Sequence, residues 1–84
     1  MNVKFLDCDH ENFFGWIRAE DGCGNDPYRL ALFYLLGVCD TMRQNYKDIY
    51  DIKERIVNVE SIKNGWQTGT TIRLTRLGLN LYNG

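Results

Sequence analysis

The residues best suited to recognition lie in one stretch near the end of the chain, from Gly65 to Arg76. A turn rich in glycine and hydroxyl groups at the start of a helix presents free backbone amides and the positive end of the helix dipole, which favours an anion. Arginines in the next two turns add charge and a planar fork of donors, and a tryptophan can stack on a ring or anchor a protein interface. The predicted binding residues are Trp66, Gln67, Thr68, Gly69, Thr70, Thr71, Arg73 and Arg76.

A purely structural interpretation of this stretch remains open. Thr68 or Thr70 would then only cap the helix, and Trp66 would fill the core beneath the turn. The spacing differs from that of a Walker phosphate-binding loop, because no Gly-Lys pair follows the first glycine at the required distance.

Elsewhere the sequence lacks a complete set of catalytic or metal-ligating residues. The cysteines are Cys8, Cys23 and Cys39. They do not form the close pairs of a structural zinc site. His10 is the only histidine, and we expect it at the surface in the first turn of a helix, while helix capping explains the acids at positions 7, 9 and 11. We therefore expect no enzyme activity, no bound metal and no cofactor.

Two helices are predicted in the first half of the chain. Asp9 is expected to cap a helix that runs to about Glu20, in which Gly15 permits close approach of a neighbour. Asp26-Pro27 is a strong start signal for the second helix, since proline at the first helical position has no amide donor to lose. The run from Leu30 to Cys39 is apolar on every side, so a helix over about 27–39 should lie at the centre of the fold.

The second half is predicted to hold two further helices around an irregular segment. Asp40-Thr41 begins a helix that ends near Ile49, and residues 50–65 form a short helix or an irregular stretch with a strand fragment. The last helix begins within 68–71 and ends near Tyr82. One face carries Leu74, Leu77, Gly78 and Leu81, and another carries Arg73, Arg76 and Asn80. The predicted fold is mainly all-α, a compact bundle of four or five short helices in a single domain over residues 1–84.

Charge is distributed unevenly along the chain. The net charge is −1, and Glu60 is the last acidic residue, followed by Lys63, Arg73 and Arg76. Nucleic acid is therefore an unexpected partner, because phosphate binding needs more cationic contacts than this. The first residues lack the apolar core of a signal peptide, and the longest apolar run is too short to span a membrane. These features predict a cytoplasmic protein without membrane association.

Several motifs together resemble those of a known family. They are Asp9-His10-Glu11 with Phe13-Phe14, Asp26-x-Tyr28, the run 31–36, Ile49-Tyr50-Asp51, the run 66–70 and the run 76–84. The set is similar to a family of small uncharacterised proteins encoded by phages, prophages and conjugative or other mobile elements of Gram-positive bacteria. The resemblance implies the cytoplasm of a bacterial host, where accessory proteins of mobile elements often inhibit defence proteins by occupying a surface.

Three functions follow as expectations. The first is a non-enzymatic accessory protein that binds and inhibits a host defence or regulatory protein, as anti-CRISPR proteins do, through the basic C-terminal helix and Trp66, with the acidic N-terminal half mimicking phosphates. The second is a binding protein or sponge for a phosphorylated nucleotide held at the threonine-rich turn. The third is a small DNA-binding regulator. A homodimer formed through surfaces that the helices leave uncovered is compatible with each.

Overall fold

The computed structural model describes residues 4–83 and is mainly helical, with one very small β-sheet. The elements in chain order are α1 (Cys8–Asp21), α2 (Pro27–Leu36), α3 (Asp40–Gln44), α4 (Tyr46–Ile49), β1 (Tyr50–Asp51), β2 (Ile56–Val57), the 3-10 helix η1 (Val59–Lys63) and α5 (Gly69–Asn83). The predicted fold class, a mainly α-helical bundle, is confirmed. Within the described residues, no helix is both long enough and apolar enough to cross a membrane.

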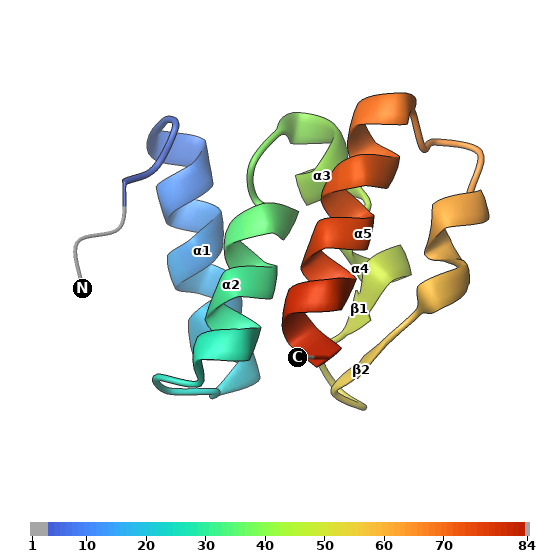
Figure 1. Cartoon of the computed structure of the whole chain (residues 1–84). Coiled ribbons are helices and arrows are strands. Elements are labelled where there is room, and N and C mark those ends of the chain that lie inside the picture. Colours follow the sequence, from blue (N-terminus) through green and yellow to red (C-terminus); the bar gives the residue numbers. More distant parts are fainter. Residues whose placement is uncertain (1–3, 84) are drawn as a thin grey trace.

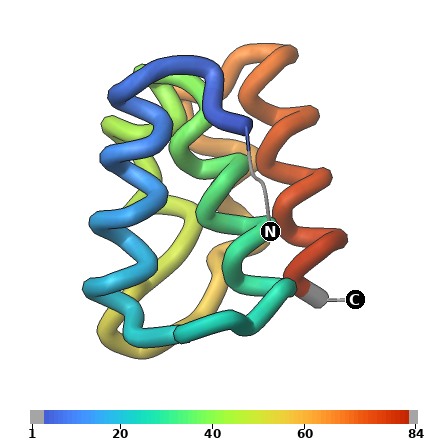
Figure 2. The backbone as a smooth tube through the Cα atoms, turned by 90° about the vertical axis from the view of Figure 1, so that its left-hand side faces the viewer, coloured from blue at the N-terminus to red at the C-terminus, as the bar shows by residue number. Residues whose placement is uncertain are grey.

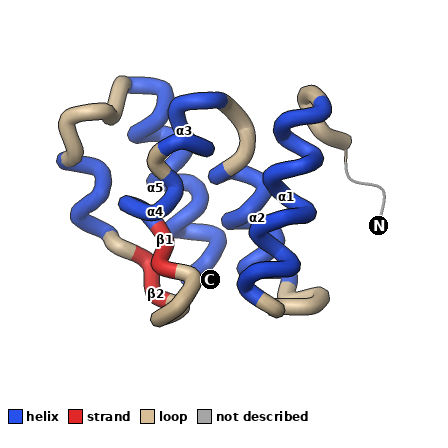
Figure 3. The backbone as a smooth tube through the Cα atoms, turned by 180° about the vertical axis from the view of Figure 1, so that it is seen from behind, coloured by secondary structure: helices blue, strands red, loops and turns tan. Residues whose placement is uncertain are grey.

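The second helix occupies the central position that its sequence predicts. Figure 1 shows α2 between α1 and α5 and antiparallel to both, and Figure 2 shows the same order from the side. The two short helices α3 and α4 and the β-hairpin lie behind α2 and α5, and they face the viewer in Figure 3. The core is built from the buried side chains of Ile17, Leu32, Phe33, Leu36, Met42, Ile49 and Tyr50.

The start of α2 is confirmed, but its predicted end is wrong. The Asp26 side chain accepts the Tyr28 amide at 3.0 Å, and Pro27 fills the first helical position. The helix stops at Leu36 instead of continuing to residue 39. A Cβ atom on Gly37 would lie 2.7 Å from the Phe13 ring, so α1 crosses the end of α2 at a point where only glycine fits.

Three predictions about α1 require correction. The helix is capped by Asp7 and not by Asp9, because the Asp7 carboxylate accepts the His10 amide at 2.8 Å. Gly15 contacts nothing that a Cβ atom would meet within 4 Å, so it does not serve close helix packing. His10 is completely buried instead of lying at the surface.

His10 is buried because its ring joins two other segments. Its Nε2 lies 2.8 Å from the Tyr34 carbonyl oxygen, and its Nδ1 accepts the Leu6 amide at 3.1 Å. An amide can only donate and a carbonyl can only accept, so these contacts define a neutral ring with its proton on Nε2. The ring thereby caps the end of α2, where the last helical carbonyls lack helical partners.

The segment from residue 40 to 65 is more divided than predicted. Asn45 separates α3 from α4, where one helix ending near Ile49 was expected. The irregular segment contains an antiparallel hairpin in which Tyr50 pairs with Val57 and Asp51 with Ile56. The 3-10 helix η1 follows, and the Asn58 side chain caps it by accepting the Glu60 amide.

Candidate functional site

The threonine-rich turn before α5 closes on itself. The Thr68 amide donates to the Thr71 hydroxyl at 2.7 Å, and the Thr71 amide donates to the Thr68 hydroxyl at 3.2 Å. Such a reciprocal pair satisfies the first donors of the helix in the manner of a capping box. Both hydroxyls are therefore engaged within the turn. An anion at this end of α5 would have to rely on the amides of Gly69 and Thr70.

Trp66 and Gln67 are tied to the interior. The half-buried Trp66 ring packs against the core, and its indole N–H donates to Asp48 at 2.8 Å. The Gln67 amide group donates to the Ser61 carbonyl and to the Thr75 hydroxyl, each at 3.2 Å. These contacts fix η1 against α5. The N–H groups of both side chains therefore have partners within the protein, whereas the buried Gln67 Oε1 has no hydrogen-bond partner in the described residues.

Arg73 and Arg76, by contrast, project from the molecule. Both are exposed, and neither makes an ion pair or a side-chain hydrogen bond within the described residues 4–83. Thr70 is exposed on the same helix. Tyr82, half a turn away around the helix from Arg73, lies against the hairpin, where its hydroxyl reaches the Arg55 carbonyl at 3.5 Å. The arginines therefore point away from the hairpin.

The buried side of α5 differs from the predicted one. Thr71, Thr75 and Leu79 are buried, whereas Leu77 and Leu81 are 48% and 42% exposed. The sequence alone places these two leucines on the apolar, inward side. The helix instead turns two threonines inward, because Gln67 and the Thr68 cap supply partners for their hydroxyl groups. Two leucines are thereby left at the surface beside the arginines.

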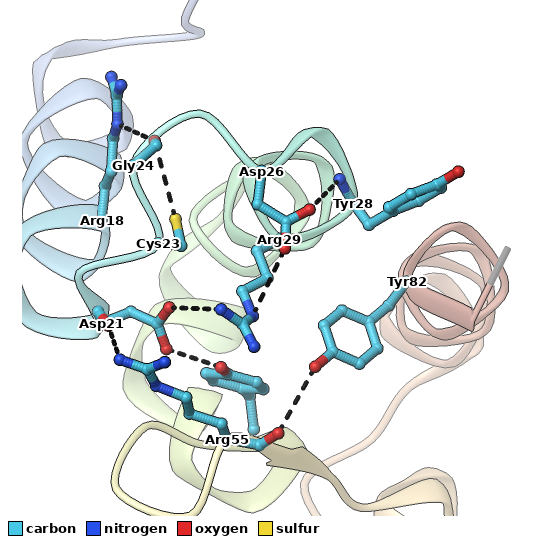
Figure 4. A network of polar contacts seen from close by, with 10 residues as sticks. Arg18, Asp21, Cys23, Gly24, Asp26, Tyr28, Arg29, Arg55 and Tyr82 are labelled. Atoms are coloured by element: carbon cyan, nitrogen blue, oxygen red, sulfur yellow. Dashed lines mark hydrogen bonds and ion pairs between the residues drawn. The ribbon is translucent and has the colours of Figure 1, made fainter.

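Tyr28 on α2 lies level with these leucines. A Cβ atom on Gly78 would lie 3.2 Å from Leu32, which marks the point where α5 crosses α2. The two helices are antiparallel (Figure 1). Tyr28, one turn before Leu32 in α2, therefore lies level with Leu81, about one turn after Gly78 in α5. Tyr28 is 56% exposed, and Figure 4 shows its ring reaching toward the end of α5.

We name this surface the α2–α5 face. It consists of Tyr28, Arg73, Arg76, Leu77 and Leu81. Only its two arginines belong to the predicted site. Tyr28 is the second residue of α2, between Pro27 and Arg29, and its place in the first turn could have indicated from the sequence that it is exposed. The exposure of Leu77 and Leu81 depends on contacts that sequence periodicity does not reveal.

A second group of polar residues lies inside the molecule around Asp21. The buried Asp21 carboxylate accepts the Tyr50 hydroxyl at 2.6 Å and lies 3.8 Å from the Arg29 guanidinium, while Arg55 donates to the Asp21 carbonyl at 2.9 Å (Figure 4). Burial, followed by the hydrogen bond to Asp21, raises the pKa of Tyr50. A hydrogen bond to Tyr82 raises the pKa of Arg29. The Tyr50 and Arg55 contacts are hydrogen bonds, whereas Asp21 Oδ2 and Arg29 Nε have no hydrogen-bond partner in the described residues and interact at ion-pair distance.

The acids of the N-terminal half are only partly available to a partner. Asp21 is buried, and Asp26 and Asp40 lie beside Arg29 and Arg43. Within residues 4–40, the exposed acids without an ion-pair partner are Asp7, Asp9, Glu11 and Glu20. All four lie on or directly before α1, so mimicry of phosphates would be confined to that helix.

The fold does not bring the three cysteines and His10 together. Cys8 is exposed, Cys23 and Cys39 are half-buried, and His10 is enclosed between α1 and α2. Within the described part of the chain, no three His, Cys, Asp or Glu side chains are close enough to hold a metal ion. A pocket of about 250 Å³ lies beside the hairpin, lined by Lys47, Asp51 and Lys53 among others. Its lining carries both positive and negative side chains and includes none of the predicted binding residues.

Comparison with known proteins gives one match. A family model described as a family of unknown function (DUF6075) matches residues 1–84. No curated protein and no solved structure matches the chain.

Proposed function

We propose that this chain, which belongs to the DUF6075 family of unknown function, is a non-enzymatic protein that binds another protein through its α2–α5 face. The observation that carries this proposal is that Arg73 and Arg76, which have no ion-pair partner among residues 4–83, lie exposed on α5 beside the exposed Leu77 and Leu81. Tyrosine and arginine are enriched among the residues that dominate protein-binding energy, and apolar neighbours exclude water around them. A contiguous apolar patch on a small protein is often an interaction site.

The binding target that we propose is a defence or regulatory protein of a bacterial host. The support is the resemblance of the sequence motifs to small proteins of phages and mobile elements. Such a protein would act by occupying a surface of its target, as anti-CRISPR proteins do. Occupancy requires a complementary face at the surface, and the α2–α5 face is the one that we assign to it.

The two alternative functions have less support from the contacts. A nucleotide sponge at the start of α5 would have the amides of Gly69 and Thr70, while the Thr68 and Thr71 hydroxyls are already paired. A DNA-binding regulator would rely mainly on Arg73 and Arg76 at this face, and two phosphate contacts give weak, salt-sensitive binding.

A transfer experiment into bacteria that carry an active defence system tests the proposal. Cells with and without the protein are challenged with a phage or plasmid that the defence system excludes, and the efficiency of entry is counted. The protein should raise the efficiency of entry, and the double variant Arg73→Glu/Arg76→Glu should no longer do so. The double variant Lys47→Glu/Lys53→Glu is the matched control, because it makes the same change in charge beside the hairpin pocket.

Two results would contradict the proposal, and a third would count against the α2–α5 face as its site. One is equal entry with and without the protein in every defence system tested. The other is full activity of the Arg73→Glu/Arg76→Glu variant, since this would place the contact elsewhere. Loss of activity in both charge variants would indicate a general effect of charge and would also count against the α2–α5 face.

A further inference from the structure

The α2–α5 face has the shape of a seam between two antiparallel helices. Gly78 lets the backbone of α5 come close to Leu32 and Leu35 of α2, with Cβ distances of 3.2 and 3.6 Å for an added methyl group. Tyr28, Leu77 and Leu81 stand exposed near this crossing. A third helix can pack its apolar side against the exposed side chains of two packed helices.

The exposed residues of α5 form two parallel rows. Leu77 and Leu81 are four residues apart and continue from the half-buried Leu74, which makes one row next to α2. Arg73 and Arg76 continue to Asn80 in the other row, on the side away from α2. An apolar row flanked on one side by cations is complementary to a helix with an apolar stripe and a flanking row of carboxylates.

Charge favours an acidic partner over a symmetric pair of copies of this chain joined through this face. No acid follows Glu60, and α2 contains none between its cap Asp26 and its end. A symmetric pair of copies joined through this face would bring four arginines together without a carboxylate between them. Like charges placed opposite one another across an interface cost binding energy, so the face suits a negatively charged surface.

We infer that the α2–α5 face binds an acidic amphipathic α-helix of its protein partner. This inference rests on the proposed function and specifies the partner's chemistry at the same face. The apolar stripe of that helix packs on Leu77, Leu81 and Tyr28. Its carboxylates pair with Arg73 and Arg76, whose guanidinium groups hold carboxylates through two parallel hydrogen bonds.

Designed peptides test this inference on the full chain. The probe is a peptide of about five helical turns with leucines at a helical spacing and glutamates elsewhere. One comparison peptide replaces each glutamate with lysine, and another has the same composition in an order that breaks the helical stripe. Binding is followed by fluorescence anisotropy of labelled peptide and by shifts of backbone amide NMR signals in α2 and α5.

The acidic amphipathic peptide should bind, and the other two should not. Arg73→Glu/Arg76→Glu should lower the affinity for the acidic peptide by about tenfold or more and should allow the lysine peptide to bind. Leu77→Ser/Leu81→Ser should lower the affinity for the acidic peptide and should not allow the lysine peptide to bind. Lys47→Glu/Lys53→Glu should leave the acidic peptide's affinity unchanged. Circular dichroism verifies that each variant is folded.

Several results overturn the inference. Equal binding of the ordered and the scrambled acidic peptide would show that charge alone is recognised. Tighter binding of anionic lipid vesicles or duplex DNA than of the peptide, abolished by the arginine variant, would assign the face to another class of partner. If no peptide binds but the effect on host defence still depends on the arginines, the inference of an acidic helix is wrong and the proposed function stands.

Discussion

The imidazole of His10 caps the carbonyl of Tyr34 across a sequence separation of 24 residues, with 2.8 Å between Nε2 and the carbonyl oxygen. The same ring accepts the Leu6 amide, so one side chain joins the N-terminal segment, α1 and the end of α2. The Tyr34 hydroxyl completes this connection by donating to the Lys4 carbonyl at 2.6 Å.

Replacing His10 with alanine should destabilise the fold by about 2–4 kcal/mol, because the Leu6 amide and the Tyr34 carbonyl lose their partner and the buried ring leaves a cavity. Urea unfolding followed by circular dichroism measures the change. Glu11→Ala is the control, since Glu11 is exposed on the same helix and should change stability by about 0.5 kcal/mol or less. A His10→Ala variant as stable as this control would show that the ring is not a structural cap.

Two glycines should respond in opposite ways to the same substitution. Gly15→Ala should stabilise the protein by up to about 1 kcal/mol, because alanine favours a helix and no atom lies within 4 Å of the new methyl group. Gly37→Ala should destabilise it by about 1–3 kcal/mol, since the methyl group would lie 2.7 Å from the Phe13 ring. Thermal unfolding of both variants checks the signs. The same sign for both would contradict the described crossing of α1 over α2.

The Tyr50 hydroxyl should make stability fall at alkaline pH. Burial and the hydrogen bond to Asp21 raise the pKa of Tyr50 above that of an unfolded tyrosine, near 10. Its contribution is therefore complete below about pH 10 and is lost as the pH rises further, with a slope of up to about 1.4 kcal/mol per pH unit.

Tyr50→Phe tests this alkaline dependence. The variant should lose about 1–2 kcal/mol at neutral pH, because one Asp21 oxygen loses its donor, and its stability should decline less above about pH 10. Urea unfolding at a series of pH values from neutral to about 11 gives both quantities. An unchanged alkaline slope would mean that Tyr50 is not the residue whose ionisation opposes folding.

The cysteines should differ in reactivity. Burial, and next the charge of Asp21, raise the pKa of Cys23, and the thiolate is the reactive form. Cys8 is exposed, so iodoacetamide at mildly alkaline pH should modify Cys8 well before Cys23. Mass spectrometry of peptides taken over time measures the order, and the reaction in urea, where the difference should vanish, is the control. Equal rates in the folded protein would contradict the described environment of Cys23.

Features set by neighbouring residues were predictable from the sequence. The start of α2 depends only on Asp26 and Pro27, and it was predicted to the residue. The central position of α2 follows from its apolar composition. The N-terminus of α1 was missed by two positions because Asp7 and Asp9 are both capable caps, and the choice is made by the contacts of His10 with Leu6 and Tyr34.

Features set by distant contacts were not predictable. The end of α2 depends on the approach of Phe13 to Gly37, and the burial of two threonines on α5 depends on partners contributed by the preceding turn. The candidate site shows both cases. The outward direction of Arg73 and Arg76 follows from helical spacing. The internal hydrogen bonds of Gln67 and the exposure of Leu77 and Leu81 depend on contacts between elements, which only the fold reveals.

The Asp21 cluster has a consequence for how the protein opens. Asp21 ends α1, Arg29 lies in α2, Tyr50 in β1, and Arg55 connects the hairpin turn to Tyr82 near the end of α5. Arg55 therefore connects the last turn of α5 to the last turn of α1, and we expect the two turns to open together. Amide protons at these two ends, far apart along the chain, should exchange with solvent deuterium through a single shared opening event, so that one cooperative unit includes the first and the last helix.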